Sequence, residues 1–443
     1  MKEIARELIK LEQELNHLPQ ADGIPIGSLL TDFWRQQYEQ AKRKTVKNRH
    51  WFLQLLSVLK FVILFIFSSK QTNKPLQISN LLICKSGEKQ HHKKLLDYIP
   101  IHIQSIKVVS NRYKEIYECI RFYSKLKILN RFLHTYFNVA PKLRRVVAEK
   151  RFSKTLLHLI LAISLIKFYS AIEYFNFKKV KLVLVDYDRS NFAPIVLAAN
   201  LMGIKTVTLQ HGAINPPYGY VPVLANEIWV WGTLWKEYLI AMGEPEGKIK
   251  IAGSTIVDSF NLTQKIGQVQ KIGIGPNPIG TDLNQSIWKP LISSLIKGGY
   301  DVMVKLHPSM DKVKEGEKVF GLGSKVFNAN EIDNQAFFQR IDLLIVSSSS
   351  LGYEAVIAGI PVAVLKESKF SEGNDSIMVD CGGFPEIKPD DKINEVILKI
   401  SNSLVQINRQ EQSFIKNKIF DLAGKDAEQM IISKINTILN ENP

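Results

Sequence analysis

The sequence has only three cysteines, Cys84, Cys119 and Cys381, with no CxxC pair and no zinc-ligand spacing. This scarcity excludes a disulfide-stapled scaffold and favours a reducing compartment. We expect no secretory signal, because residues 1–20 have mixed charge and no apolar core segment. With 45% hydrophobic and 23% charged residues over 443 positions, the composition predicts a globular protein of two domains plus some appended helix.

Several nucleotide and metal motifs are also missing. The loop 276–281 is neither GxGxxG nor GxxxxGK[ST], so it has neither the dinucleotide fingerprint nor a P-loop. The sequence contains no HExxH, EF-hand or GxSxG pattern. We therefore expect no metal site and no bound cofactor.

Charge is unevenly distributed along the chain. Lys and Arg number 58 and Asp and Glu 42, a net charge of +16. Residues 1–221 contain 35 basic and 15 acidic residues, whereas residues 222–443 contain 23 and 27. A basic half can attract nucleic acid, anionic lipid or an acidic polymer. Its cations are dispersed over predicted helices without a nucleic-acid recognition motif, which favours an anionic membrane surface over nucleic acid.

Residues 1–75 are predicted to form helices with basic linkers. The apolar run 51–67 follows a basic cluster and is shorter than the about 20 residues that span a bilayer. It fits a helix that lies in the membrane interface with cations on the lipid headgroups, and a buried helix of the first domain is the alternative. We expect the second apolar helix, 155–168, to belong to a protein core.

From Leu76 onward, short apolar runs alternate with helical stretches, which predicts parallel sheets with crossover helices. The predicted fold class is α/β, with two Rossmann-like doubly wound domains facing a cleft and an N-terminal helical extension. The predicted boundaries are 1–75 for the extension, 76–255 for the first domain, 270–415 for the second and 416–443 for a C-terminal helix. The predicted strands are 78–84, 106–109, 180–185, 205–209, 227–231, 271–275, 301–306, 325–327, 342–346 and 361–365. Helices are predicted at 190–202, 284–298, 332–340, 350–358 and 389–405, and the linker between the domains at 254–270.

Polar residues follow the predicted strands of the first domain at the sheet edge where parallel α/β sheets bind ligands. His211 follows strand 205–209, and Gly212 permits a positive φ and a close approach of a ligand. We expect His211 to be the base that activates an acceptor hydroxyl. Asp186 or Asp188, on a neighbouring strand, is the alternative base or orients the imidazole, although Asp188 also suits capping of a helix at 190–202. The expected acceptor-side residues are Gln210, Gly212 and Asn215.

In the second predicted domain, a serine run precedes an apolar helix; it consists of Ser347, Ser348, Ser349 and Ser350. Hydroxyls and the free N–H groups of a helix N-terminus predict a phosphate site, with simple capping as the alternative. Glu354, one turn into this helix, can accept a hydrogen bond from a ribose hydroxyl or complement the helix dipole.

His307 and Pro308 follow strand 301–306, and we expect this histidine to contact the donor phosphate, opposite the serine-capped helix across adjacent strand ends. A purely structural histidine is the alternative. Asn277, after strand 271–275, completes the expected donor-side residues.

A resemblance to GT-B glycosyltransferases of bacterial surface polysaccharide synthesis covers roughly residues 180–440. For the first domain it is carried by VLVDYDRSNFAPIVLAANLMGIKTVTLQHG and EIWVWGTLWKEYLIAMGEPEGKIKIAGS, and for the donor domain by VMVKLHPS and LLIVSSSSLGYEAVIAGIPVAVL. The His-Pro and Ser-Ser pair is similar to that of bacterial sialyltransferases and polysialyltransferases, which hold a CMP-sugar with it. CDP-glycerol glycerophosphotransferases pair a His-Gly with a His-Pro in a similar way. The Asp/Glu-Asp/Glu-Gly motif of the sialyltransferases is missing.

This resemblance implies a metal-independent, inverting glycosyltransferase of capsular or other surface polysaccharide synthesis. A nucleotide-sugar donor and a glycan or lipid-linked acceptor would be its substrates, at the cytoplasmic face of the cell membrane. His211 would activate the acceptor, and His307 with Ser347 to Ser350 would hold the donor phosphate. The alternatives are a CDP-glycerol-type polyol-phosphate transferase, a nucleotide-sugar 2-epimerase of the same architecture, a nucleic-acid-binding protein and a non-catalytic assembly partner.

Overall fold

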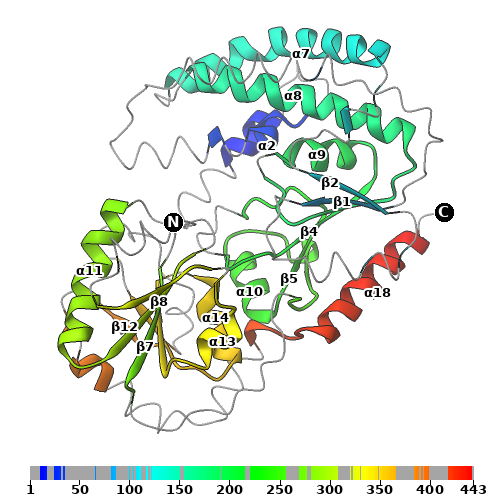
Figure 1. The fold of residues 1–443 in the computed structure, drawn as a ribbon. Helices are drawn as coiled ribbons and strands as arrows, with labels where there is room; N and C mark the ends of the chain where they lie inside the picture. Colours follow the sequence, from blue (N-terminus) through cyan, green and yellow to red (C-terminus); the bar gives the residue numbers. More distant parts are fainter. Residues whose placement is uncertain are drawn as a thin grey trace.

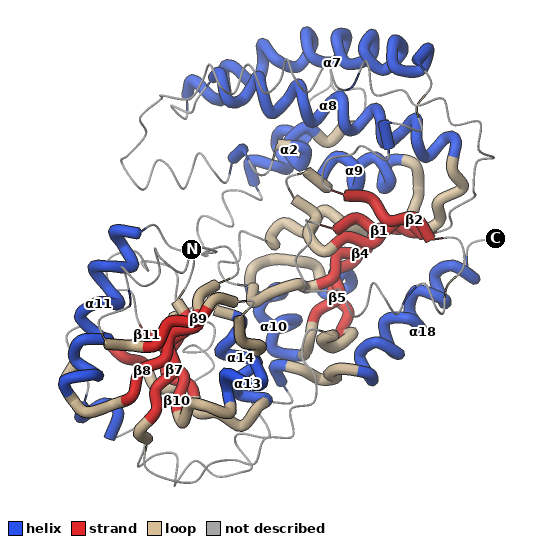
Figure 2. The backbone as a smooth tube through the Cα atoms, in the orientation of Figure 1, coloured by secondary structure: helices blue, strands red, loops and turns tan. Residues whose placement is uncertain are grey.

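A computed structural model gives the fold of the protein (Figure 1). The residues it describes are 10–16, 24–30, 33–34, 65, 81–85, 99, 103, 106–110, 116–117, 120, 122–149, 154–189, 191–214, 220–255, 269–276, 281–307, 320, 323–329, 331–347, 349–365, 384–388, 391–392, 394–398 and 418–441. Its strands form two six-stranded sheets, both fully parallel, and helices cover both sheets (Figure 2).

The first sheet has the strand order β2-β1-β3-β4-β5-β6. Its strands are β1 (Leu81–Lys85), β2 (Ile106–Ser110), β3 (Leu182–Val185), β4 (Lys205–Leu209), β5 (Glu227–Val230) and β6 (Ile249–Ile251). The chain moves outward from β1 to β2 on one side and from β3 to β6 on the other, so the direction reverses between β1 and β3. Such a reversal creates the crevice in which doubly wound sheets bind ligands.

Alternate residues of each central strand lie on opposite faces of the sheet, and both faces are buried. Leu182 and Leu184 of β3 pack toward helix α18 (Lys425–Glu441) together with Ile431 and Ile435. Val183 and Val185 pack on the other face, in the core shared with helix α9 (Ala193–Leu201). This explains why the strands are continuous apolar runs rather than alternating ones.

Two long helices connect β2 to β3 and form further layers over the α9 face: α7 (Phe122–Glu149) and α8 (Lys154–Phe177). α8 packs against α9, and α7 packs on the outside of α8 (Figure 1). By length and composition, residues Leu157–Phe177 of α8 could cross a membrane, but 67% of its most apolar window is buried within the protein. The prediction that 155–168 belongs to a core is confirmed.

The described part of the N-terminal extension packs into the core of the first domain. Helix α2 (Ile26–Leu29) lies against α9, and Phe33 and Trp34 are buried in the same cluster. Within the apolar run 51–67 only Phe65 is described; it is buried, with its ring 5.4 Å from that of Tyr117. The rest of that run, predicted to be an interfacial or a buried helix, lies outside the described residues.

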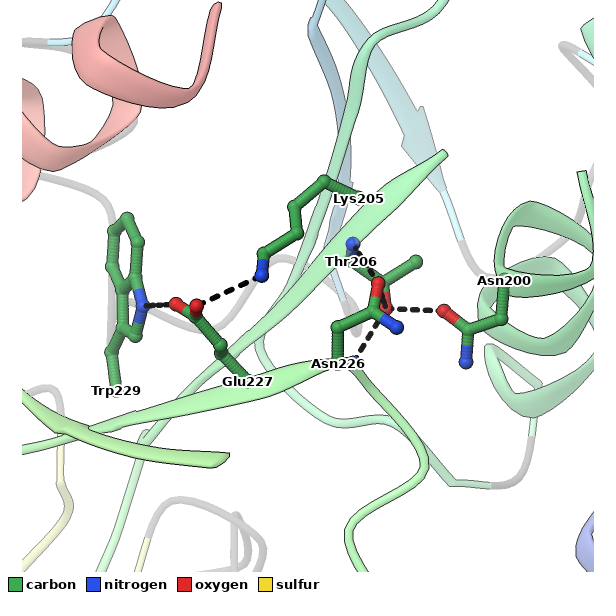
Figure 3. A network of polar contacts seen from close by, with 6 residues as sticks. All are labelled: Asn200, Lys205, Thr206, Asn226, Glu227 and Trp229. Carbon is green, nitrogen blue, oxygen red and sulfur yellow. Dashed lines mark hydrogen bonds and ion pairs between the residues drawn. The ribbon is translucent and has the colours of Figure 1, made fainter. Parts of the chain in front are cut away.

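A polar network joins the amino ends of β4 and β5 (Figure 3). His211 follows the carboxyl end of β4, at the opposite edge of the sheet. Thr206 Oγ1 donates to Asn200 Oδ1 of α9 at 2.6 Å, and the Asn226 backbone N–H donates to Thr206 Oγ1 at 2.8 Å. Lys205 and Glu227, the first residues of the two strands, form an ion pair at 2.8 Å. These contacts fix how α9 meets the sheet and are structural.

The second sheet has the order β12-β11-β10-β7-β8-β9. Its strands are β7 (Lys271–Gly275), β8 (Asp301–Lys305), β9 (Lys325–Phe327), β10 (Leu343–Val346), β11 (Val362–Leu365) and β12 (Glu386–Ile387). Helix α11 (Thr281–Lys297) covers one face through Trp288 and Ile292. Helices α13 (Asn334–Phe338) and α14 (Ser350–Ile357) cover the other.

The chain returns to the first domain at its C-terminal end. Residues 418–424 lie along the carboxyl end of β5: the Asp421 N–H donates to Trp231 O, and its carboxylate accepts the Thr233 N–H at 2.9 Å. α18 then covers the β1-β3-β4 face of the first sheet. The sequence pattern predicts a helix at this end but not the sheet that it covers.

The two domains meet through α10 (Thr233–Ala241) and α14. The Trp235 ring lies 4.9 Å from the Tyr353 ring, and Trp235 Nε1 donates to Ile419 O at 3.1 Å. α10 begins directly after β5, and α14 directly after β10. Contact between their first turns therefore brings the carboxyl edges of the two sheets toward each other.

The predicted strands agree with the structure to within a few residues at each end, but two strands were missed: β6 and β12, of three and two residues. Helices predicted at 190–202, 284–298, 332–340 and 350–358 are α9, α11, α13 and α14. In the predicted helix 389–405, the described helical residues are 394–398. Most of the predicted linker 254–270 lies outside the described residues.

Gly232, just before α10, lies close to the backbone of the C-terminal segment, and a substitution there tests this close packing. A Cβ built on Gly232 would lie 2.6 Å from Lys418 O and 2.7 Å from Ile419 O, both backbone atoms. We expect Gly232→Ala to lower the free energy of unfolding by about 1–3 kcal/mol, measured by urea denaturation. Gly247→Ala is the matched control, because a Cβ there meets nothing within 4 Å. Equal stability of the two variants would contradict the close approach.

Candidate functional site

His211 lies at the carboxyl edge of the first sheet and is held by two oxygen atoms. β3 and β4 are neighbouring parallel strands, as predicted, so the loops that follow them meet. His211 Nδ1 lies 2.6 Å from the Asp186 backbone oxygen and 3.0 Å from Tyr220 Oη. A carbonyl oxygen can only accept, so Nδ1 carries the hydrogen and Nε2 holds the lone pair. In this tautomer the imidazole can take a proton through Nε2.

Two tyrosine rings enclose this imidazole. The Tyr187 ring meets it edge to face at 5.5 Å, and the Tyr220 ring lies 5.5 Å away at 30°. Burial lowers the pKa of His211, although the charges of Asp186 and Asp188 and the Asp186 carbonyl act in the opposite direction. The neutral form therefore dominates near pH 7. Burial also raises the pKa of Tyr220 far above its usual value, which keeps the phenol protonated.

The two aspartates beside His211 have different surroundings. Asp186 contacts the imidazole through its backbone carbonyl. Asp188 is buried, and its Oδ2 accepts the backbone N–H groups of Leu224 at 2.7 Å and Ala225 at 3.1 Å. The capping interpretation of Asp188 is wrong, because α9 begins after Phe192 without a side-chain cap. The carboxylate of Asp188 anchors a loop instead.

That loop, residues 220–225, is held by three further charged side chains. Arg189 Nη2 donates to Tyr220 O at 3.0 Å, Glu244 Oε1 accepts the Val223 N–H at 2.8 Å, and Lys248 Nζ donates to Val223 O at 2.9 Å. The loop thereby presents the Tyr220 hydroxyl to His211. Sequence reasoning missed these roles. Glu244 and Lys248 follow no predicted strand, and Arg189, which comes shortly after strand 180–185, was not among the predicted site residues.

Gln210 and Gly212 flank the imidazole along the chain. Gln210 is buried; its Nε2 donates to Gly212 O at 3.0 Å, and its Oε1 accepts the Trp231 N–H at 3.0 Å. The amide therefore joins the ends of β4 and β5. Gly212 does not adopt the positive φ that glycine permits, and a Cβ there would meet nothing within 4 Å. Open space beside Gly212 is compatible with the expected approach of a ligand.

On the second sheet, β7 separates the strands that carry His307 and the serine run. β8 pairs with β7, and β7 pairs with β10. His307 and Ser347 therefore follow strands two positions apart, roughly 10 Å at the usual strand spacing, rather than adjacent strands as predicted. The reversal of strand order falls between β7 and β10, so the strand that leads into the serine run borders the point of reversal, where doubly wound sheets in general bind ligands.

The serine run leads directly into α14. Ser349 is the N-cap, and its hydroxyl accepts the Leu351 N–H at 3.3 Å; Ser350 is the first helical residue, and Ser347 is buried. The capping interpretation is thus confirmed for Ser349. Phosphate binding stays a prediction, supported by the N–H groups that the first turn of a helix leaves without intrahelical acceptors.

Glu354 lies inside the second domain. Its Oε2 accepts from Asn334 Nδ2 at 2.5 Å. The nearby Lys305 Nζ donates to the carbonyl oxygens of Ala329 at 3.0 Å and Ile332 at 2.7 Å. Burial raises the pKa of Glu354 to about 7, although Asn334 and Lys305 both favour the charged form. With 8% of its surface exposed, Glu354 is engaged with protein groups, and the expected ribose contact stays a prediction.

Four predicted site residues lie outside the described residues: Asn215, Asn277, Pro308 and Ser348. In the described part of the chain, no group of three or more His, Cys, Asp or Glu side chains could hold a metal ion.

No protein-family model and no curated protein matches the sequence. Solved structures do. One is that of a putative UDP-N-acetylglucosamine 2-epimerase from Listeria monocytogenes, with a TM-score of 0.50 and 13% identity over 83% of this chain and 98% of that one. Another is that of the Methanocaldococcus jannaschii UDP-GlcNAc 2-epimerase in complex with UDP-GlcNAc and UDP, with a TM-score of 0.48 and 14% identity over 81% and 99%.

The wall teichoic acid polymerase TagF also matches, with a TM-score of 0.48 and 12% identity over 89% of this chain and 99% of that one. At such identities a likeness shows the fold alone. The chain has a GT-B-like fold of two Rossmann-like doubly wound domains, and the predicted fold class is confirmed.

The tautomer and pKa of His211 can be measured without knowledge of the reaction. A nuclear magnetic resonance titration should give His211 a pKa below about 6.5, its value in an unfolded chain, with the hydrogen on Nδ1 at neutral pH. Since the folded pKa is the lower one, neutral His211 contributes stability above pH 6.5 that is lost as the pH falls through the folded value. A hydrogen on Nε2, or a pKa above 6.5, would contradict this geometry.

The raised pKa of Glu354 predicts the opposite pH dependence of the unfolding free energy. Its folded pKa of about 7 exceeds the unfolded value of about 4.3, so its contribution is full below pH 4 and is lost as the pH rises through 7. Glu354→Gln keeps an acceptor for Asn334 but does not titrate. From pH 5 to pH 8 the wild type should lose about 1–3 kcal/mol of unfolding free energy relative to this variant.

Urea denaturation at the two pH values measures this change. The substitution also removes the attraction between Lys305 and the Glu354 carboxylate, but any pH-independent difference in unfolding free energy between the two proteins cancels in this comparison. Glu237→Gln, at an exposed position on α10, is the matched control and should follow the wild type within about 0.5 kcal/mol. Parallel pH curves for the wild type and Glu354→Gln would show that Glu354 does not titrate in this range.

Proposed function

We propose that the protein is a nucleotide-sugar-dependent glycosyltransferase of cell-surface polysaccharide synthesis. The observation that carries this proposal is His211: a neutral imidazole with its Nδ1 hydrogen engaged and its Nε2 in the basic form, at the carboxyl edge of the first sheet. The carboxyl edge of the second sheet is turned toward it and carries a serine-capped helix beside the point where the strand order reverses. A base on one domain opposite an anion site on the other suits transfer between two substrates.

In the proposed reaction the nucleotide sugar binds to the second domain with its phosphate at the N-terminus of α14. The acceptor hydroxyl loses its proton to His211 Nε2, and its oxygen forms a bond to the anomeric carbon. The bond from that carbon to the phosphate oxygen breaks, so the configuration inverts and the nucleotide leaves as an anion. Backbone N–H groups and hydroxyls of Ser347–Ser350 stabilise the anion, with His307 as a further donor and no metal required.

The acceptor in this proposal is a glycan or a lipid-linked glycan at the cytoplasmic face of the membrane, to which the basic first half of the chain would be drawn. A nucleotide-sugar 2-epimerase is the second candidate, because the fold accommodates that activity in the proteins it resembles. A CDP-glycerol-type transferase is the third. Incubation with each nucleotide donor alone separates the first two: an epimerase converts the donor sugar, whereas a transferase needs an acceptor.

The transferase proposal predicts how variants at His211 behave. Loss of a general base costs about 100- to 10,000-fold in rate, so His211→Ala should lose that much of kcat/KM. Donor binding should stay within a few-fold of the wild type. Thermal stabilisation by UDP-, CMP-, CDP-, GDP- and TDP-linked sugars measures this binding. His134→Ala, at an exposed position on α7, is the control and should retain full turnover. Undiminished transfer by His211→Ala would remove the base from the mechanism.

A further inference from the structure

α7 is the outermost layer of the first domain. The order from the sheet outward is α9, α8 and α7, so one long side of α7 faces away from the protein (Figure 1). Its 28 residues give it a length of about 42 Å. The inner side is occupied by packing against α8, where Ile128, Val139 and Leu143 are buried and Thr135 and Tyr169 share a hydrogen bond.

The outer side of α7 exposes an apolar stripe. Leu126 is 51% exposed, Leu133 41% and Phe137 67%. Their spacing of seven and four residues places them within an arc of roughly 40° on the helix surface. They are three of the eight large hydrophobic side chains that are exposed in the described part of the chain, and Phe137 is the most exposed of all. Apolar groups aligned in this way mark an interaction surface, unlike single exposed ones.

The charged side chains of α7 are mostly cations. α7 contains six Lys and Arg residues and one Glu. Lys127 and Arg131 both reach the one buried carboxylate of Glu173 on α8, at 3.8 and 3.7 Å, so their combined charge is only half compensated. Arg144 donates to His158 Nε2, which must be unprotonated to accept, and Arg145 is exposed beside it. The surface around the stripe is therefore positive.

We propose that the outer side of α7 docks on an anionic lipid surface. Leu126, Leu133 and Phe137 would enter the boundary between headgroups and acyl chains, and Lys127, Arg144 and Arg145 would contact the phosphates. A nucleic acid would use such cations but gains nothing from a three-residue aliphatic and aromatic stripe. The proposal supplies the contact surface for a membrane location and does not depend on which reaction the protein catalyses.

Co-sedimentation of the full chain with phospholipid vesicles tests the proposal. The wild type should bind vesicles of mixed phosphatidylcholine and phosphatidylglycerol and bind pure phosphatidylcholine vesicles much more weakly. Leu126→Ser/Leu133→Ser/Phe137→Ser should lower the partition coefficient tenfold or more, with thermal unfolding unchanged, because these side chains are exposed. Leu201→Ser/Ile240→Ser is the matched control, because it removes exposed apolar groups from α9 and α10, and it should bind as the wild type does.

A second pair of variants tests the charges. Lys127→Gln/Arg145→Gln should weaken binding to the anionic vesicles about tenfold, and added salt should abolish the difference. Lys250→Gln/Lys425→Gln, with exposed lysines on other elements, should have no such effect.

Three results would overturn the proposal: no vesicle binding by the wild type, undiminished binding by the triple variant, or binding to duplex DNA in place of vesicles. Undiminished binding by the triple variant would place the membrane contact elsewhere in the chain. Turnover of a lipid-free acceptor is measured separately in the same variants. Failure of the docking surface thus remains distinct from failure of the proposed reaction.

Discussion

The relative position of the two domains depends on the contacts made by the indole of Trp235. It lies against Tyr353 of the second domain and donates to the carbonyl oxygen of Ile419 in the returning chain. Trp231, beside it, stacks on Phe420 at 5.2 Å. Burial of several aromatic rings provides most of the energy of such a contact, and the indole N–H bond fixes its direction. Both domains and the C-terminal segment are thus joined at one place, beside the carboxyl edges of both sheets.

This contact is directly linked to the candidate base. The Trp231 N–H bonds to Gln210 Oε1, and Trp231 Nε1 bonds to the Gln210 carbonyl oxygen at 2.9 Å. The next residue in the chain is His211. The imidazole is therefore held from one side by the residues that join the domains, and from the other by Asp186 and Tyr220. A side chain held on both sides keeps its tautomer and direction without a ligand, which is what a preorganised base requires.

The local sequence pattern was sufficient to predict most strands, because strands that are buried on both faces are continuous apolar runs. The strands β4, β7 and β9 have the predicted bounds. The edge strands β6 and β12 are too short to produce such a run. The rule that ligands bind at strand ends directed attention to His211 and to the serine run. It could not find Tyr220 or Glu244, because both lie in loops many residues beyond the nearest strand end. Strand order is a long-range property, so the separation of His307 from the serines by β7 was not predictable.

Among the described cations of the first half of the chain, some are buried within the protein and others are exposed on its surface. Lys167 in α8 is buried, its pKa is lowered by burial to about 8, and its ammonium is hydrogen-bonded to Asn191 at 2.5 Å. Arg189 is likewise buried and bonded to the Tyr220 carbonyl. These cations hold the loops around the imidazole together and contribute little field outside the protein. An external field requires exposed charges, and α7 supplies them on the outermost layer. Of the cations described here, those of α7 therefore contribute to the field outside the protein, whereas Lys167 and Arg189 act within it.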